Sequence, residues 1–146
     1  MNVGELCTRR AIVVSTSATL TEVAQLMSAE HVGAVVVTAA GDSHPRVAGI
    51  ITDRDIVRAQ LERTADLSRL SAGETMTPKP LALDEHESIE GAIAHLRARG
   101  VRRAPVTAAD GSPIGLVSVD DLLVHLATTL IGAAAIVAQQ PRAERS

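Results

Sequence analysis

The chain has 146 residues, of which 46% are hydrophobic and 21% charged, and its formal net charge is −3. This length is enough for one buried core or for two small half-domains that share one. The sequence contains no Phe, Tyr or Trp, which excludes the aromatic platforms on which most RNA-binding and single-strand-binding modules stack bases. The acidic balance argues against a broad cationic surface for duplex DNA, so we expect no nucleic-acid partner.

The cysteine and histidine content predicts neither an intramolecular disulfide nor a metal site. Cys7 is the single cysteine, and the five histidines lack metal-ligand spacing. The opening segment MNVGELCTRR has no apolar stretch of the kind found in a secretory signal. We therefore expect a cytoplasmic protein without a bound metal.

Two halves of the chain repeat each other when they are followed in chain order. The matched segments are LCTRRAIVV and TMTPKPLAL from Leu6 and Thr75, TLTEVAQLM and SIEGAIAHL from Thr19 and Ser88, HVGAVVV and GVRRAPV from His31 and Gly100, and GIITDRDIV and GLVSVDDLL from Gly49 and Gly115. In order, each half predicts an extended piece, a helix, a strand, a turn, a second strand and a second helix. The strands VGAVVV and VAGIIT are apolar without alternation, which indicates that both faces of the sheet are covered.

The repeat predicts an α/β (α+β) fold made of two β-α-β-β-α units. We expect the first unit over residues 5–62, a polar linker over 63–73 and the second unit over 74–128. A unit of this size without a disulfide or a metal is marginal alone, so the two units should pack together.

The C-terminal segment 129–146 extends beyond the repeat. Residues 122–141 contain no Asp, Glu, Lys or Arg, a length close to the lower limit of a membrane span. Polar residues and Gly132 interrupt the run and its second half is mostly Ala, which favours a buried or partner-facing helix over a membrane helix. We expect no membrane partner, an apolar helix that packs on another subunit or back on the core, and a frayed tail.

Each predicted second strand ends in a hydroxyl residue that is followed three positions later by an aspartate. These pairs are Thr52 with Asp55 and Ser118 with Asp121. Taken singly, each pair is typical of a helix capping box. A strand end that leads into a helix can also present N–H groups to an anion and a carboxylate to a ribose, and the occurrence of the pattern in both halves favours this functional interpretation.

An arginine pair, Arg102 and Arg103, lies on a predicted strand of the second half, where the first half has Gly33 and Ala34. Because this strand is expected to be inside, at least one guanidinium should have an anionic partner, either a phosphate or a neighbouring carboxylate. The sequence lacks a nucleophile–base pair, a metal cluster and a Gly-rich phosphate loop, so we do not expect an enzyme.

The paired GIITDRDIV and GLVSVDDLL segments, with HVGAVVV and GVRRAPV before them, resemble a tandem pair of cystathionine-β-synthase (CBS) domains. The resemblance covers about residues 5–128, and the chain resembles the small stand-alone bacterial CBS-pair proteins. It implies a pseudo-twofold module that assembles as a homodimer and regulates an unidentified protein partner. It also implies two clefts for adenosine-containing ligands such as AMP, ADP, ATP or S-adenosylmethionine, with no required cofactor.

The resemblance also implies roles for individual residues. Asp55 and Asp121 would hold ribose hydroxyls, and Thr52 and Ser118 would bind the ribose or the α-phosphate. Adenine would lie against aliphatic walls, which the resemblance assigns to Cys7, Ile12, Met76 and Leu81.

Arg102 and Arg103 would bind phosphate in the cleft of Ser118 and Asp121. We therefore expect two unequal clefts, with the nucleotide in the Asp121 cleft. The Asp55 cleft, with Gly33 and Ala34 in place of the arginines, is expected to be weaker, empty or suited to a less charged adenosyl ligand unless Arg54 or Arg58 reaches into it. The alternative function is a dimeric interaction or stress-related scaffold, in which the two aspartates serve only as helix caps.

Overall fold

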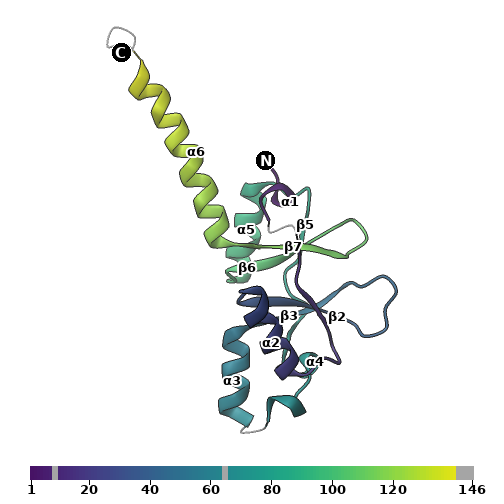
Figure 1. Cartoon of the computed structure of the whole chain (residues 1–146). Helices are drawn as coiled ribbons and strands as arrows, with labels where there is room; N and C mark the ends of the chain where they lie inside the picture. The colour runs from purple at the N-terminus through teal and green to yellow at the C-terminus, as the bar shows by residue number, and fades with distance from the viewer. Residues whose placement is uncertain (8–9, 64–65, 141–146) are drawn as a thin grey trace.

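The computed structural model describes residues 1–7, 10–63 and 66–140, and it has two halves with the same order of elements (Figure 1). The first half contains α1 (Val3–Leu6), β1 (Val13–Ser15), α2 (Leu20–Glu30), β2 (Ala34–Thr38), β3 (Val47–Thr52) and α3 (Asp53–Arg63). The short 3-10 helix η1 (Leu67–Arg69) follows. The second half contains α4 (Ala72–Thr75), β4 (Thr77–Pro78), β5 (Leu83–Asp84), α5 (Ile89–Arg99), β6 (Arg103–Thr107), β7 (Pro113–Ser118) and α6 (Val119–Gln139). The predicted mixed fold of two β-α-β-β-α repeats is confirmed.

The structure has two small sheets, and each half forms most or all of one of them. The first sheet has the order β1-β2-β3-β4 and the second the order β5-β6-β7. In both, the opening strand runs parallel to the next one, which then pairs antiparallel with the third. All five residues of β2 are buried, as its uninterrupted apolar sequence predicts.

The opening helix of each repeat crosses to the other half. Val3 and Cys7, at the two ends of α1, are buried in the core of the second half, and the Gly4 N–H donates to the Glu85 carbonyl at 2.8 Å. Ala72 of α4 is buried in the core of the first half, and β4 pairs with β3. Leu70, from the segment predicted as a linker, is also buried in that first core. The two halves are therefore joined by exchanged segments as well as by the chain between them.

The first long helix of each half starts at the predicted N-cap. The Thr19 hydroxyl accepts from the Glu22 N–H in a full capping box, and the Ser88 hydroxyl accepts from the Gly91 N–H. One face of each helix then enters its core, through Leu20, Val23 and Met27 in α2 and through Ile89, Ala92 and Leu96 in α5. These helices fix the connections that lead into β2 and β6.

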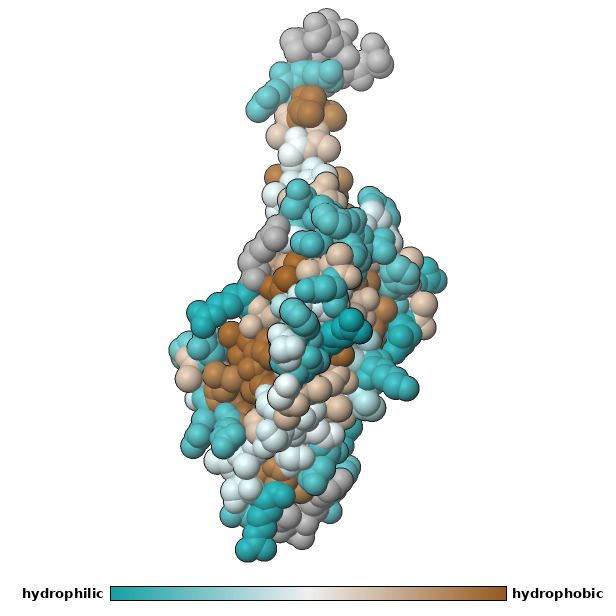
Figure 2. Space-filling view, turned by 90° about the vertical axis from the view of Figure 1, so that its right-hand side faces the viewer, coloured by the Kyte–Doolittle hydropathy of each residue, from teal (hydrophilic) through white to brown (hydrophobic). Residues whose placement is uncertain are grey.

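Helix α6 begins in the second half and then projects away from the body (Figure 1). Leu122 is its one buried residue, and many large apolar side chains beyond it are exposed. In the space-filling view the helix rises above the body as a column of pale and brown atoms (Figure 2). By length and composition alone it could cross a membrane. The expectation that this segment packs back on the core is wrong within the described residues, because the helix continues past the edge of the body.

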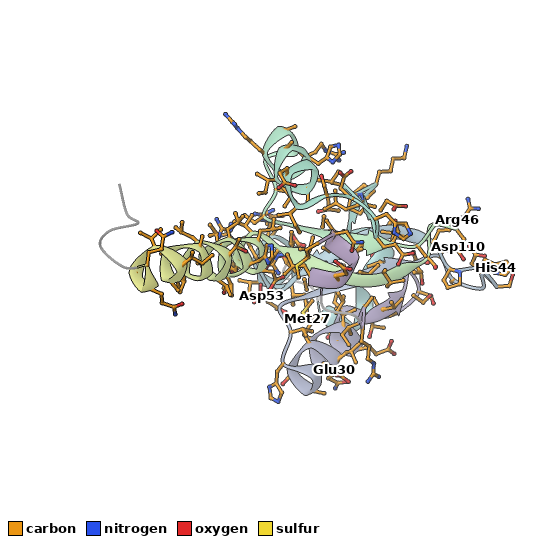
Figure 3. All side chains as sticks on the ribbon, turned by 90° about the horizontal axis from the view of Figure 1, so that it is seen from above. Met27, Glu30, His44, Arg46, Asp53 and Asp110 are labelled. Atoms are coloured by element: carbon orange, nitrogen blue, oxygen red, sulfur yellow. The ribbon has the colours of Figure 1, made fainter. Side chains whose placement is uncertain are left out.

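The two hairpin loops, residues 39–46 and 108–112, meet at the other side of the module (Figure 3). The Arg46 Cγ lies 3.5 Å from the position that a Cβ would take on Gly111, whose positive φ of 83° suits glycine. The Asp110 carboxylate accepts from the Ser112 hydroxyl at 2.6 Å and from the Ser112 N–H at 2.9 Å. These bonds, with a smaller contribution from His44, hold the pKa of Asp110 below its usual value.

Candidate functional site

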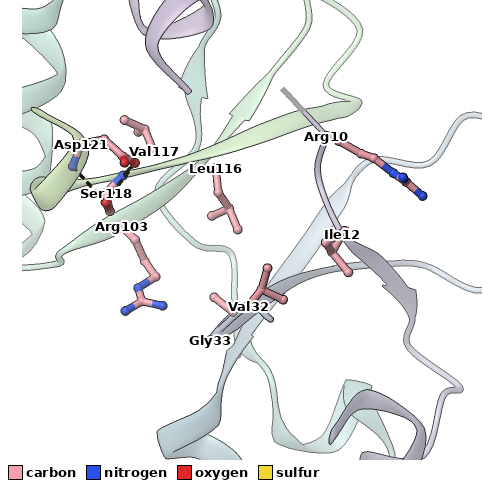
Figure 4. A pocket seen from close by; sticks show the side chains of 10 residues that line it. Arg10, Ile12, Val32, Gly33, Arg103, Leu116, Val117, Ser118 and Asp121 are labelled. Atoms are coloured by element: carbon pink, nitrogen blue, oxygen red, sulfur yellow. Dashed lines mark hydrogen bonds between the residues drawn. The ribbon is translucent and has the colours of Figure 1, made fainter. Parts of the chain in front are cut away.

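Two pockets lie between the halves, and each combines the capped strand end of one half with segments of the other. The larger, of about 500 Å³, contains Thr52 and Asp55, and we call it the Asp55 pocket. The smaller, of about 250 Å³, contains Ser118 and Asp121, and we call it the Asp121 pocket (Figure 4). The first volume falls within the usual range for small-molecule sites, about 300–1,000 Å³, and the second just below it.

The Asp55 pocket is built around the start of α3. The Thr52 N–H donates to Asp55 Oδ2 at 2.8 Å, and the Asp55 N–H donates to the Thr52 hydroxyl at 3.3 Å. This reciprocal pair satisfies two backbone donors at the helix N-terminus, as a capping box does. Both side chains are half-buried, so the cap holds the carboxylate at the pocket wall with one oxygen engaged.

The Asp121 pocket has nearly the same arrangement at the start of α6. Asp121 Oδ2 accepts from the Ser118 N–H and from the Ser118 hydroxyl, both at 2.9 Å, and the Asp121 N–H donates to that hydroxyl at 3.2 Å (Figure 4). Among the described residues these bonds engage Oδ2 in both pockets, which leaves Oδ1 to accept from a ligand hydroxyl. The capping interpretation is confirmed, and it is compatible with ligand binding.

The arginines are distributed unequally between the pockets. The Asp55 pocket is lined by four of them, Arg54, Arg99, Arg102 and Arg103. Arg10 and Arg103 line the Asp121 pocket, so the expectation that the Asp121 cleft holds the phosphate-binding arginine pair is wrong. Of the two arginines that were expected to strengthen the other cleft, Arg54 lines the Asp55 pocket and Arg58 does not. Arg103 thus lies between the two, and its Nη1 atom is 3.9 Å from the position that a Cβ would take on Gly33 in the Asp121 pocket.

The predicted assignment of the arginine pair was wrong in two respects. Arg102 lies in the Asp55 pocket rather than beside Ser118 and Asp121, whereas Arg103 lines both pockets. Gly33 and Ala34 line the Asp121 pocket, since each pocket takes its second wall from the other repeat.

The arginine pair is also more exposed than the sequence predicts. The side chain of Arg102 is 74% exposed, and its guanidinium lies 3.6 Å from the carboxylate of Asp120. Such an exposed pair is weak and does not occupy the guanidinium strongly. Arg103 is exposed as well, so neither cation is buried.

Only two of the four residues predicted as apolar pocket walls line a pocket. Ile12 lines the Asp121 pocket and Leu81 the Asp55 pocket. Cys7 and Met76 line neither, and their prediction as wall residues was wrong. Cys7 is 5% exposed within the second core, and Met76 packs against Gly49 of β3. Both are drawn inward because the opening helices cross between the halves.

Sequence reasoning did not single out several lining residues. Arg99 ends α5 just before Gly100, and Arg10 precedes β1 on an exposed segment. Val32, Leu116 and Pro80 add apolar wall. A repeat alignment can find the caps, but it does not indicate which segments of the opposite half face them.

Within the described ranges, no group of three or more His, Cys, Asp or Glu side chains could hold a metal ion. The crystal structure of hypoxic response protein I with two coordinated zinc ions is similar to this chain, with a TM-score of 0.73 and 28% identity, and the match covers 86% of this chain and 98% of that one. The zinc ions belong to that protein.

Other comparisons agree on the architecture. A CBS domain protein from Pyrobaculum aerophilum complexed with AMP has a TM-score of 0.75 at 26% identity, over 88% of this chain and 99% of that one. Hypoxic response protein 1 of Mycobacterium tuberculosis is 32% identical over 126 residues, 86% of this chain and 81% of its own length. An uncharacterized 17.7 kDa protein of Acidianus ambivalens is 32% identical over 120 residues, 82% of this chain and 70% of its own.

The CBS domain family model matches residues 3–62 and 72–128, one match for each repeat. Together the matches span most of the chain and include both capped strand ends and both pockets. The chain therefore belongs to the CBS domain family and is a tandem CBS pair.

Proposed function

We propose that this CBS pair is a non-catalytic regulatory module that binds adenosine nucleotides, with the more strongly phosphorylated ligand in the Asp55 pocket. One observation carries the proposal: a capped carboxylate, a helix N-terminus and four arginines line a single cavity of about 500 Å³. The AMP complex of the Pyrobaculum aerophilum relative supports the ligand class.

Each part of a nucleotide has a chemical counterpart in the Asp55 pocket. Asp55 Oδ1 accepts from a ribose hydroxyl while Oδ2 keeps the cap. Phosphate oxygens accept from Arg99, Arg102 and Arg103, whose guanidiniums form short, charge-assisted hydrogen bonds. Adenine lies on aliphatic side chains, among them Leu81, because the chain has no aromatic residue to stack on it.

The Asp121 pocket suits a smaller or less charged adenosine ligand. Its volume is about half as large, and the arginines that line it are Arg10 and Arg103. Asp121 holds the ribose there through Oδ1, as Asp55 does in the larger pocket. The two pockets thereby sense different ligands, or different degrees of phosphorylation.

Arg103 couples the pockets. A phosphate in one pocket recruits a guanidinium that the other pocket also uses, so binding at one site weakens binding of an anion at the other. Such coupling regulates a protein partner only when the ligand binds two states of the module with different affinity. We assign this role to a cytoplasmic homodimer, where soluble nucleotides are available.

The test is a calorimetric melting scan against AMP, ADP, ATP, S-adenosylmethionine and NAD, because the chain lacks Trp and Tyr for fluorescence. A nucleotide at 100 times its dissociation constant stabilises the folded state by about 2.7 kcal/mol, which raises Tm by roughly 5–10 °C. We expect the largest shift with ATP or ADP. A flat panel would overturn the proposal and favour the interaction scaffold.

A further inference from the structure

The distal half of α6 lies outside the residues that the CBS domain family model matches. The family match ends at residue 128, whereas α6 continues to Gln139. Large apolar side chains along the helix are exposed to water, including Leu123 at 57%, Leu130 at 70% and Val137 at 59%. A soluble helix rarely leaves a continuous apolar surface of this kind uncovered.

The apolar residues of α6 follow a heptad repeat. Leu123, Leu130 and Val137 are spaced seven residues apart, and a second row with the same spacing contains Val119, Leu126 and Ala133. The two rows alternate at intervals of three and four residues, which is the a/d pattern of helices that pair side by side. Polar residues occupy another face, at positions His125, Thr128, Thr129 and Gln139. The two rows define a seam, which we name the α6 seam; Val124, Ile131 and Ile136 are exposed apolar residues outside it.

The α6 seam starts inside an apolar groove of the body. Val119, Leu123 and Leu126 line a cavity of about 340 Å³ between α5 and α6, together with Leu96 and Val101. The seam then continues without interruption along the free part of the helix. A helix that packs on the α6 seam would fill this groove at one end and cover the projecting segment at the other.

We propose that α6 pairs antiparallel with α6 of a second copy of this chain, through residues 119–137 of each. In this register Leu126 of one copy lies opposite Leu130 of the other, and positions 123 and 119 lie opposite 133 and 137. A row of type a then meets a row of type d in every layer, as antiparallel pairing requires. The contact is the same on both copies and closes as a twofold dimer.

Charge favours this orientation. Residues 122–140 carry no Asp, Glu, Lys or Arg, so pairing brings no like charges together. Arg97 and Arg102 lie at the rim of the groove near the start of α6. The antiparallel register places the C-terminal end of the second α6 beside them, and the open carbonyls of a helix end carry partial negative charge that attracts cations.

A lipid bilayer matches the helix less well. Its first turn contains Asp120 and Asp121, and Asp121 is held in the cap that forms a pocket wall. The polar face with His125, Thr128 and Thr129 would contact lipid on one side of an isolated span. Pairing through the α6 seam leaves that face in water.

Cysteine cross-linking of the full chain tests the pairing. The double variant Leu123→Cys/Ala133→Cys places its thiols in one layer of the antiparallel register, so mild oxidation is expected to give a covalent dimer. The single variants Leu123→Cys and Ala133→Cys should stay largely uncross-linked. The matched control Thr128→Cys lies opposite its own copy in the same register but on the polar face, and it should give no more dimer than the unmodified chain, whose Cys7 is buried.

Other outcomes overturn the proposal. Efficient dimer formation by either single variant would mean parallel pairing, and equal cross-linking of the control would mean random collision. Failure of the double variant to cross-link would exclude the α6 seam as the contact. Flotation of the full chain with phosphatidylcholine and phosphatidylglycerol vesicles, together with loss of the cross-link, would assign the helix to a membrane instead.

Discussion

The two pockets share one motif and differ in what the opposite repeat contributes. The caps are nearly identical, with the Thr52 and Ser118 N–H groups donating to the following aspartate at 2.8 and 2.9 Å. The segment from Arg99, at the end of α5, to Arg103, at the start of β6, adds three arginines to the Asp55 pocket. The connection between α2 and β2 adds Val32 and Gly33 to the Asp121 pocket. In this tandem repeat, the strand end supplies the same capped carboxylate to each pocket, and the segment from the other half fixes the charge of the pocket.

Removing arginines from the Asp55 pocket should have the largest effect on ligand affinity. The double variant Arg99→Ala/Arg102→Ala is expected to weaken ATP binding by about 100-fold or more, because each lost hydrogen bond to a charged group costs about 1.5–3 kcal/mol. Binding of adenosine should change little. Titration calorimetry measures both ligands, and Arg97→Ala is the matched control on α5, since Arg97 lines the α6 groove instead. Equal losses for adenosine and ATP would contradict the account.

Arg103→Ala should affect both pockets at once. We expect about a tenfold loss of AMP affinity at each site, the value of one charged hydrogen bond at the lower limit. The variant should also bind its two nucleotides independently, because the shared guanidinium is gone. A calorimetric two-site titration detects both changes. Loss at a single site would show that Arg103 serves one pocket alone.

The packing of the exchanged α4 segment on the first sheet can be disrupted at Gly49. A Cβ at this position of β3 would collide with Met76, which follows α4, so Gly49→Ala should destabilise the fold by about 1–3 kcal/mol. Gly132→Ala is the opposite control, because nothing lies near that position and alanine favours the helix by about 0.5–1 kcal/mol. Urea unfolding followed by circular dichroism measures both. An unchanged midpoint for Gly49→Ala would argue against the packing of Met76 on β3.

The smallest expected effect is a change in the pKa of Asp110, in one of the two hairpin loops. The Asp110 carboxylate has a pKa below its unfolded value of 3.8, so its contribution to stability is present above that pH and is lost as the pH falls through the folded pKa. Ser112→Ala removes the hydroxyl bond and should raise the pKa of Asp110 toward 3.8, while the backbone bond remains. Carbon-13 NMR titration measures the change. Ser43→Ala in the other loop is the control and should leave Asp110 unaffected.

The sequence predicted the elements and the caps because these depend on local chemistry. Thr52 with Asp55 and Ser118 with Asp121 satisfy backbone donors within one turn, so spacing alone identifies them. The repeat order likewise follows from hydrophobic pattern and turn residues. These features need no knowledge of how the halves pack.

The residues that line the pockets are determined by how the two halves pack together. The spacing of residues in the sequence does not predict this packing. Cys7 and Met76 were misplaced because α1 and α4 exchange between cores, and Arg102 was misplaced because the opposite repeat supplies each second wall. The matched segments of the repeat indicate which residues correspond. They do not indicate which of the corresponding residues face each other.

Titration calorimetry of ATP into the unmodified chain, Asp55→Ala and Asp121→Ala tests the inequality of the pockets most directly. We expect the tighter binding event to disappear in Asp55→Ala and to persist in Asp121→Ala. Each variant also loses a cap, at a cost of about 1 kcal/mol in stability, so both are compared at a temperature where they remain folded. Persistence of the tighter event in Asp55→Ala, with its loss in Asp121→Ala, would contradict the account.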